Sequence, residues 1–274
     1  MSFTLEGRTA LVTGSGRGIG LAIAKRLLAT GSNVMLNDMD EDLLRQAEAD
    51  LGHSDRVRHI TGDLTHLATP DKVVDATLNA FGGIDIIVNN AGYTWDSVIQ
   101  KTTDEQFQAM LDIHLVTPFR ILRAASEYIR SAAKRESAHS QRVMRKVVNI
   151  TSIAGTDGNP GQAGYGSAKA GVIGLTKTMA KEWGRYNVNV NAVGFGLIET
   201  RLVQPSSDNT QLHMHGTDIK IGVPAPALEA LKERCPLGRL GTPEEAAGAV
   251  LFFCSPLSDY VTGEVLICGG GLHF

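Results

Sequence analysis

The sequence predicts an α/β fold in which a parallel sheet is covered by helices. Short apolar runs alternate along the chain with longer amphipathic stretches, a pattern typical of strand–helix–strand units. The first run is followed directly by a glycine-rich turn and a helical stretch. The chain has 274 residues, of which 43% are hydrophobic and 20% charged. This is enough apolar material for one large core, so we expect a single domain over residues 1–274.

Seven stretches are predicted as β-strands, because they are short, mostly aliphatic and bounded by residues that favour turns. Helical periodicity separates them, for example over residues 21–28 and 161–186. Strands connected through helices run parallel, with helices on both faces of the sheet. The predicted strands are residues 9–13, 33–37, a third that ends before Asp63, 84–88, 146–151, 188–193 and 264–268.

The turn after the first strand contains Gly14, Gly18 and Gly20. Glycines let the backbone turn tightly and approach a pyrophosphate, whose charge the N–H groups and the positive end of the following helix can hold. The common Gly-x-Gly-x-x-Gly pattern is incomplete, because its sixth position is Ile19. The second strand leads to Asp38, eighteen residues after Gly20, about where a carboxylate would bond the adenosine ribose. Together these residues predict a dinucleotide site, although a surface loop or a helix cap would use the same residue types.

Three polar residues in the second half of the chain form a candidate acid–base site. Tyr165 and Lys169 are four residues apart in a predicted helix and share a face, and Ser152 ends the fifth strand. A tyrosine with a pKa near about 10 is a poor base at neutral pH, and an exposed i,i+4 pair supplies only roughly a few tenths of a kcal/mol. Tyr165 therefore needs a desolvated pocket and a second positive charge, such as an oxidised nicotinamide ring. The alternatives are a serine that caps a turn and a tyrosine–lysine pair on a helix surface.

These motifs resemble those of the short-chain dehydrogenases/reductases along essentially the whole chain. Further matching segments are Asp63-Leu64 after the third strand, residues 89–92 (Asn-Asn-Ala-Gly) after the fourth, and residues 194–200 after the sixth, where Phe195 replaces the family's proline. Residues 236–245 and 263–270 are most similar to the endings of 3-oxoacyl carrier-protein reductases. The resemblance implies a doubly wound Rossmann-type sheet with the strand order 3-2-1-4-5-6-7.

The resemblance also implies a mechanism and a set of cofactor contacts. Ser152 would bond the substrate oxygen, Tyr165 would exchange a proton with it, and Lys169 would orient the cofactor ribose while hydride passes between nicotinamide and carbon. The implied cofactor contacts are Gly14, Ser15, Arg17, Gly18, Ile19, Gly20, Asp38, Asp63, Leu64, Asn90, Ala91, Gly92, Tyr165, Lys169, Gly196, Ile198 and Thr200.

His114 departs from the family pattern, which has an asparagine at this position of a long helix beginning near Thr103. In the family this asparagine acts largely through its backbone carbonyl, which holds a water that links the lysine to solvent. Pro118 lacks the N–H that would normally pair with the carbonyl of residue 114, so we expect that carbonyl to be free. We therefore predict that His114 keeps the relay through its main chain, while its ring is either packed or an additional titrating group.

Cofactor preference depends on two residues with opposite effects. Asp38 repels a 2′-phosphate and bonds ribose hydroxyls, whereas Arg17 beside Gly18 attracts that phosphate. The carboxylate lies directly at the ribose, while Arg17 is expected to be solvated. NAD(H) is therefore favoured over NADP(H).

The substrate is expected to be a carbonyl compound or secondary alcohol, with a 3-oxoacyl thioester as the first candidate. The alternative is an NAD-dependent dehydrogenase of another secondary alcohol, such as a sugar, steroid or hydroxyacid. Residues 93–96 and 153–159 are expected to border the substrate, because they follow the fourth and fifth strands. Residues of about 200–235 are rich in turn formers and are predicted to form a lid.

Composition sets the remaining expectations. A net charge of -3 shows no bias toward polyanions, so we expect no nucleic-acid partner. No apolar run approaches the ~20 residues of a membrane span, and the start does not resemble a signal peptide, so a cytoplasmic location is expected. Cys235, Cys254 and Cys268 are predicted to be reduced structural thiols. No metal is expected, because His213 and His215 have no third ligand in evidence.

Two expectations concern partners of the protein. The family commonly forms tetramers through the helices that contain His114 and Tyr165, so a homotetramer is expected. A basic run is either the solvated end of a helix and an insertion, or a docking site for an acidic acyl carrier protein. The run comprises Arg130, Lys134, Arg135, Arg142, Arg145 and Lys146.

Overall fold

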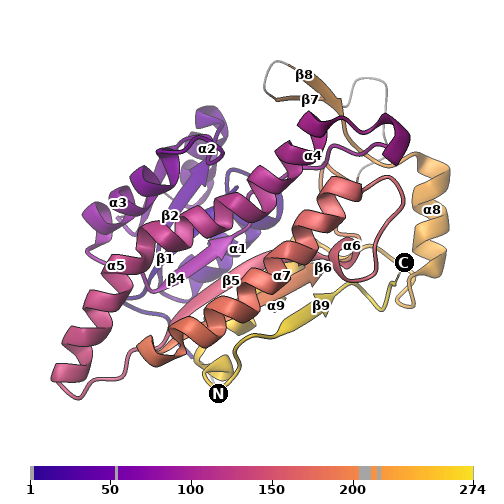
Figure 1. Cartoon of the computed structure of the whole chain (residues 1–274). Coiled ribbons are helices and arrows are strands. Elements are labelled where there is room, and N and C mark those ends of the chain that lie inside the picture. The colour runs from indigo at the N-terminus through magenta and orange to yellow at the C-terminus, as the bar shows by residue number, and fades with distance from the viewer. Residues whose placement is uncertain (1–2, 53–54, 204–210, 215–216, 274) are drawn as a thin grey trace.

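The computed structural model describes residues 3–52, 55–203, 211–214 and 217–273. It confirms the predicted alternation of strands and helices (Figure 1). The strands are β1 Thr9–Thr13, β2 Asn33–Asp38, β3 Val57–Thr61, β4 Ile86–Asn89, β5 Arg145–Ser152, β6 Val188–Phe195, β7 Gln211–Met214, β8 Thr217–Lys220 and β9 Val265–Cys268. The helices are α1 Gly18–Ala29, α2 Glu41–Asp50, α3 Thr69–Phe81, α4 Asp104–Leu111, α5 Thr117–Ala138, α6 Ile153–Thr156, α7 Ala163–Trp183, α8 Ala225–Arg234 and α9 Pro243–Cys254.

Seven strands form one parallel sheet in the order β3-β2-β1-β4-β5-β6-β9. This is the predicted order, with β9 as the seventh strand of the sheet. β7 and β8 pair antiparallel in a separate hairpin, which was not predicted and which lies within the expected lid. The order reverses between β1 and β4, so the carboxyl ends of these strands flank the switch point where ligands bind in such sheets.

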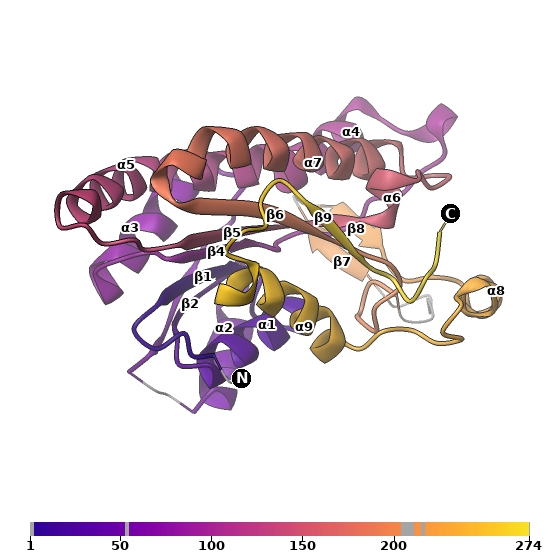
Figure 2. The same ribbon diagram turned by 90° about the horizontal axis from the view of Figure 1, so that it is seen from below.

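Helices cover both faces of the sheet, with α1, α2 and α9 on one side and α3, α5 and α7 on the other (Figure 2). Each face has its own apolar core. Ile23 and Leu27 of α1 pack with Val250 of α9 on the first face, and Ile121 of α5 packs with Trp183 of α7 on the second. Because both faces of the sheet are covered, β1, β4 and β6 are buried along their whole length.

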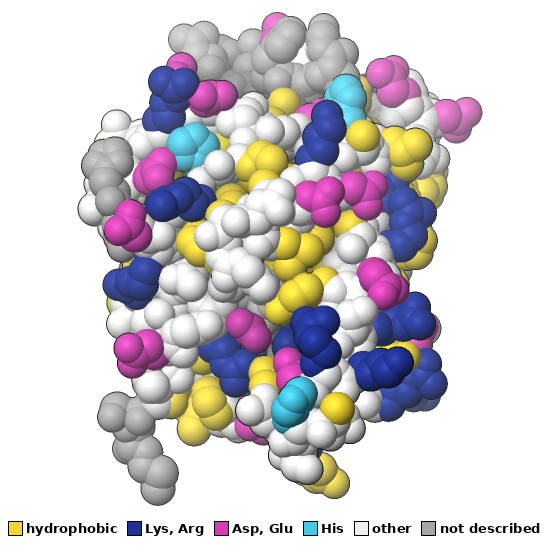
Figure 3. Space-filling model, turned by 90° about the vertical axis from the view of Figure 1, so that its left-hand side faces the viewer, with side chains coloured by type: hydrophobic (Ala, Val, Ile, Leu, Met, Phe, Trp, Pro, Cys, Tyr) yellow, Lys and Arg dark blue, Asp and Glu magenta, His cyan; other side chains and the backbone are white. Residues whose placement is uncertain are grey.

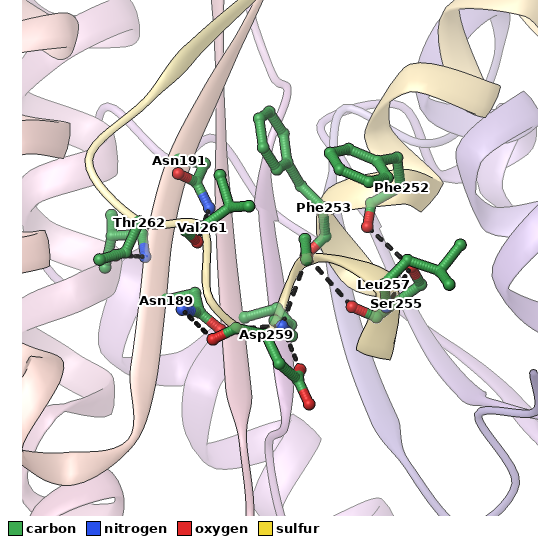
Figure 4. A network of polar contacts seen from close by, with 12 residues as sticks. Asn189, Asn191, Phe252, Phe253, Ser255, Leu257, Asp259, Val261 and Thr262 are labelled. Atoms are coloured by element: carbon green, nitrogen blue, oxygen red, sulfur yellow. Dashed lines mark hydrogen bonds and ion pairs between the residues drawn. The ribbon is translucent and has the colours of Figure 1, made fainter.

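A polar network fixes the end of the sheet that lies away from the switch point (Figure 4). Lys146 of β5 donates to Asn189 Oδ1 of β6 at 2.8 Å and pairs with Asp259 Oδ1 at 2.7 Å. Asn189 Nδ2 donates to the carbonyl of Asp259, and Asn191 Nδ2 donates to the carbonyl of Val261. The segment that leads into β9 is therefore bonded to two central strands.

The structure buries two residues of the basic run. Arg145 is buried and pairs with Glu136, and Lys146 is buried in the network just described, so neither is a surface cation. Arg145 and Ser152 also lie at opposite ends of β5, seven residues or about 23 Å apart at roughly 3.3 Å per residue. The run therefore lies far from the candidate acid–base site.

The surface over the β3 side of the molecule carries basic and acidic side chains intermingled with apolar ones (Figure 3). Such mixed charge favours no extended polyanion. Within the described part of the chain, no helix is long and apolar enough to cross a membrane.

Candidate active site

The turn between β1 and α1 can exist only with glycine at several positions. Gly14 and Gly18 have φ values of 61° and 57°, in the left-handed region. A Cβ added to Gly20 would lie 2.1 Å from the carbonyl oxygen of Gly14, and one added to Gly14 would lie 2.7 Å from Cα of Ala91. The backbone is thus drawn into a tight cradle at the start of α1, as a bound pyrophosphate requires.

The loop after β4 is bonded to this turn. Asn90 Nδ2 donates to the carbonyl oxygens of Thr13 and Gly14 at 2.9 and 3.0 Å. The N–H groups of Asn90 and Ala91 both donate to Thr13 Oγ1 at 3.0 Å. Thr13 was not among the predicted site residues, although a threonine that ends an apolar strand is a visible signal. These bonds join the two loops that flank the switch point.

Asp38 lies against the glycine turn. Its carboxylate accepts from the N–H of Gly16 at 3.1 Å and from the N–H of Met39 at 2.9 Å. The carboxylate is therefore held beside the turn, where the sequence placed the ribose. Arg17 is exposed at the start of α1, and Arg201 of the lid is a second cation in this region. Burial and the nearby charge of Arg17 lower the pKa of Arg201, while Asp38 raises it.

The structure also places the other residues that we expected to contact the cofactor. Ser15 faces inward, because its hydroxyl donates to the carbonyl of Val12 at 2.8 Å and accepts from the N–H of Asn37 at 3.0 Å. Asp63 accepts from the Thr65 hydroxyl at 2.7 Å. The remaining residues of this set lie near the same end of the sheet. Leu64 and Ile198 are buried, and Thr200 lies close to Gly18. The remaining residues are Ile19, Leu64, Gly196, Ile198 and Thr200.

Ser152, Tyr165 and Lys169 are brought together where β5 ends and α7 begins. Ser152 caps α6 and accepts from the N–H of Ala154 at 3.1 Å. The Lys169 ammonium lies 5.6 Å from the centroid of the Tyr165 ring. It also donates to the carbonyl of Ile150 at 2.7 Å. That carbonyl could not have been identified from the sequence, because any residue provides one.

Burial controls the protonation of this group. It raises the pKa of Tyr165 to about 12, and a hydrogen bond with Ser152 only partly opposes it. Burial also lowers the pKa of Lys169 to about 7. Both shifts have the same cause, because a low-dielectric site disfavours the phenolate and the ammonium alike. Tyr165 is therefore protonated at neutral pH.

Replacing Lys169 with methionine is expected to stabilise the protein at low pH. The pKa of Lys169 falls from 10.5 to about 7 on folding, so between these values the unfolded chain binds the extra proton and stability rises with pH. Below pH 7 the folded state carries the buried charge of the Lys169 ammonium, which lowers the free energy of unfolding. Lys169→Met should raise the free energy of unfolding by about 2–4 kcal/mol at pH 6, after allowing for the lost bond to Ile150, and much less near pH 10. Urea denaturation at both values measures this, with exposed Lys177→Met as the control. An equal gain at pH 10 would contradict this account.

The His114 ring is packed against the candidate catalytic tyrosine, Tyr165. It is buried, and its plane meets that of Tyr165 edge to face at 89°, with centroids 5.0 Å apart. Nε2 lies 2.7 Å from the carbonyl oxygen of Tyr93, which only accepts, so Nε2 carries the proton. Burial and the charge of Lys169 hold the pKa of His114 well below its usual range. The ring is thus neutral, and a Cβ at Gly92 would lie 2.2 Å from its Cε1.

The main chain at His114 lies in a π-helical turn, Asp112–Val116, between α4 and α5. The N–H of Thr117 bonds the carbonyl of Asp112, five residues back, and Pro118 has no N–H. In a regular α-helix the carbonyl of residue 114 would accept from the N–H of residue 118, and Pro118 removes that donor. π-turns of this kind occur frequently at functional sites, and this one supports the predicted main-chain relay.

We expect His114→Asn to keep the rate within tenfold, because we predict that the relay runs through the carbonyl and not through the ring. Pro118→Ala should slow turnover more, since it supplies an N–H that can pair with that carbonyl. Steady-state kcat for both variants decides the matter. A loss well over tenfold in His114→Asn, about 1.4 kcal/mol or more, would show that the side chain takes part.

A doubly wound sheet with a serine, a tyrosine and a lysine gathered at the carboxyl end of β5, next to the switch point, fits an oxidoreductase acting on CH–OH groups. A family model described as "Enoyl-(Acyl carrier protein) reductase" matches residues 14–273. The chain belongs to the short-chain dehydrogenase/reductase family, as its sequence suggested.

The chain is similar in sequence, over nearly its whole length, to proteins of known name. It is 36% identical over 269 residues to a 3-oxoacyl-[acyl-carrier-protein] reductase FabG of Vibrio cholerae, covering 98% of each chain. It is 37% identical over 276 residues to the protein of that name from Chlamydia muridarum, covering 99% of this chain and 100% of the relative.

Two solved structures from Brucella melitensis have the same fold. One is a 3-ketoacyl-(acyl-carrier-protein) reductase complexed with NADH, with a TM-score of 0.82 and 26% identity, covering 98% of this chain and 99% of the other. The second is a short-chain dehydrogenase/reductase described as glucose/ribitol dehydrogenase, with a TM-score of 0.81 and 28% identity over 100% of both chains.

Proposed function

We propose that the protein reduces 3-oxoacyl thioesters to the corresponding secondary alcohols with a nicotinamide cofactor. The observation that carries this proposal is the position of the buried Tyr165 hydroxyl beside Ser152 and Lys169, where β5 ends and α7 begins. With a pKa raised to about 12 by burial, the phenol is in the state that donates a proton to a carbonyl oxygen. The names of the 3-oxoacyl-[acyl-carrier-protein] reductases at 36% and 37% identity support the substrate class.

The residues of the glycine turn fit a dinucleotide, because the cradle there would be filled by any Cβ at Gly14 or Gly20. The nicotinamide, when bound, supplies or accepts the hydride. Ser152 bonds the substrate oxygen, and Tyr165 gives that oxygen a proton. Lys169, whose ammonium is already beside the ring, favours the phenolate that remains and bonds the cofactor ribose. The carbonyl of His114 holds the water through which Lys169 exchanges protons with solvent.

NAD(H) is the cofactor that we propose, because the Asp38 carboxylate is fixed by the N–H groups of Gly16 and Met39 at the expected ribose position. A 2′-phosphate would meet this charge directly. Arg17 and Arg201 oppose the effect, since both lie in the same region. We expect kcat/KM to be at least about tenfold higher with NADH than with NADPH, and Asp38→Asn to reduce this ratio. A clear preference of the unmodified protein for NADPH would refute the assignment.

A second candidate is an NAD-dependent dehydrogenase of another secondary alcohol. Asp38 favours it, because cellular NAD is mostly oxidised, and one of the structural neighbours is described as a glucose/ribitol dehydrogenase. Two sets of assays separate the candidates, namely acetoacetyl-CoA with NADH and a panel of sugars, steroids and hydroxyacids with NAD⁺. Turnover of the thioester alone supports the first candidate. Turnover of an alcohol without any thioester activity would replace it with the second.

We also propose that the protein acts as a homotetramer. Phe107 of α4 and Phe119 of α5 are 38% and 45% exposed, and aromatic rings on a helix surface are typical of subunit contacts. We further propose that the natural substrate is carried by an acyl carrier protein. Arg145 and Lys146 are buried at the end of β5 opposite Ser152, so these two residues do not form part of its docking surface.

A further inference from the structure

The loop after β4 places a carboxylate beside the candidate catalytic tyrosine. Asp96 Oδ2 accepts a hydrogen bond from Gln162 Nε2 at 2.8 Å, and Gln162 is the residue immediately before α7. Tyr165 lies in the first turn of that helix. Trp95, the neighbour of Asp96, and Tyr165 pack against the same apolar cluster. Asp96 therefore borders the space where the substrate carbonyl would lie.

Main-chain and side-chain bonds fix the position of this carboxylate. The N–H of Ser97 donates to the carbonyl of Gly161 at 2.8 Å, so the two loops are bonded next to Asp96. Asn159 Nδ2 donates to Gln162 Oε1 at 3.0 Å and so orients the amide that holds the carboxylate. Because the carboxylate is held in place, a ligand meets its charge without first having to order it.

The charge of Asp96 is not neutralised by a neighbouring cation. Among the described residues, no lysine, arginine or histidine forms an ion pair with it. The residue is exposed, so a ligand can reach it. Partial burial of the carboxylate raises its pKa, and the bond from Gln162 opposes this shift by favouring the ionised form. The charge also reaches Tyr165, whose pKa is raised first by burial and further by Asp96.

A free carboxylate on the substrate would bring a second negative charge into this space. Like charges repel, and an unfavourable pairing of this kind lets a site reject a competing ligand. Lys169 does not offset the repulsion, because it is buried and its ammonium donates to the carbonyl of Ile150. An ester or thioester of the same acid carries no charge at that position and is not repelled.

We propose that Asp96 is a specificity-determining residue that excludes substrates with a free carboxyl group near the reacting carbon. The enzyme would then act on an acyl group only as its ester or thioester. This rests on the proposed reduction of 3-oxoacyl thioesters and deepens it, because it names the group that separates the thioester from the free 3-oxo acid. Of the alternative substrates, hydroxyacids would be excluded, whereas sugars and steroids would not.

The test compares acetoacetate with ethyl acetoacetate, which share the 3-oxo group and differ in charge. With NADH at neutral pH, kcat/KM of the unmodified protein should be at least about tenfold higher for the ester. Asp96→Asn keeps an oxygen that accepts from Gln162 and removes the charge. In this variant the ratio of ester to acid should fall at least about fivefold, mainly through a gain on acetoacetate.

Two further variants separate charge from structure. Asp96→Glu keeps the charge and should keep a high ratio of ester to acid. Asp75→Asn removes an exposed carboxylate from α3 and should leave the ratio unchanged. Circular dichroism and NADH fluorescence show whether each variant folds and binds cofactor. An unchanged ratio in Asp96→Asn, or equal use of acid and ester by the unmodified protein, would overturn the inference.

Failure of the proposed function has a different signature. If neither acetoacetyl-CoA nor ethyl acetoacetate is reduced, 3-hydroxybutyrate and its ethyl ester are compared with NAD⁺, and then as ligands of the NADH complex by fluorescence. A preference for the ester that Asp96→Asn loses would support the role of Asp96 without the thioester assignment. An equal response to acid and ester would reject that role. Reduction of acetoacetyl-CoA without discrimination against acetoacetate would reject the inference alone.

Discussion

Tyr165→Phe is expected to lower kcat/KM by about 10³-fold or more while NADH binding changes less than about threefold. Phenylalanine keeps the ring that meets His114 edge to face at 5.0 Å, so the shape of the site should survive. It removes the hydroxyl that lies beside Ser152 and is protonated at neutral pH, and general acid catalysis contributes about 10²–10⁴-fold in typical cases. Steady-state assays with acetoacetyl-CoA or an active alcohol, together with NADH fluorescence titration, measure the two effects separately.

The control for this change is Tyr186→Phe, at the 3₁₀ turn Gly184–Tyr186 that follows the far end of α7. It removes a tyrosine hydroxyl from the end of the same helix and should keep full activity. Retention of more than a tenth of the activity in Tyr165→Phe would show that another group supplies the proton. A binding protein without turnover would show no rate to lose in either variant.

Gly20→Ala is expected to weaken NADH binding at least about 100-fold and to lower the free energy of unfolding by about 2–4 kcal/mol. The added Cβ would lie 2.1 Å from the carbonyl oxygen of Gly14 and 2.7 Å from Nδ2 of Asn90. The backbone must therefore move, and with it the two bonds that Asn90 makes to the turn. Forcing a methyl group into a packed site costs about 1–3 kcal/mol, and here two anchoring bonds are disturbed as well. Calorimetric titration with NADH and urea denaturation give both quantities.

Gly174→Ala provides the comparison, because Gly174 lies within α7 and no atom would contact an added Cβ within 4 Å. This change should leave cofactor affinity unaltered and stabilise the protein by about 0.5–1 kcal/mol, since alanine favours the helix over glycine. Normal NADH affinity in Gly20→Ala would show that the pyrophosphate does not use this turn.

Most of the fold could be predicted from the sequence, because strand alternation and turn residues leave local signals. Six of the seven sheet strands were identified to within two residues at each end, the third was placed only by its end before Asp63, and the family resemblance supplied their order. The hairpin Gln211–Lys220 was missed, since its strands are four residues each and pair only with one another. The burial of Arg145 and Lys146 was also missed, because their partners Glu136 and Asp259 are fixed by tertiary structure.

The sequence predicted Ser152, Tyr165 and Lys169 as one candidate site, and the structure brings them together, but their electrostatics were not predicted. Tyr165 and Lys169 have the expected spacing, yet burial raises one pKa and lowers the other. A sequence pattern cannot show how deep a side chain lies. The same holds for the bond from His114 to the carbonyl of Tyr93, because main-chain acceptors leave no trace in a sequence. Of the two options for the His114 ring, packing is confirmed, and titration near neutral pH is not supported.

The bonds of Lys146 with Asn189 and Asp259 have a consequence for how such an enzyme changes over evolution. They fasten β5, β6 and the approach to β9 at the end of the sheet opposite the ligand. Insertions between β6 and α8 then add or remove contacts only at the other end. Substrate range can therefore diversify by replacement of the segment between β6 and α8 while the scaffold keeps its stability. The end of the sheet that carries this segment is the place to graft new specificities.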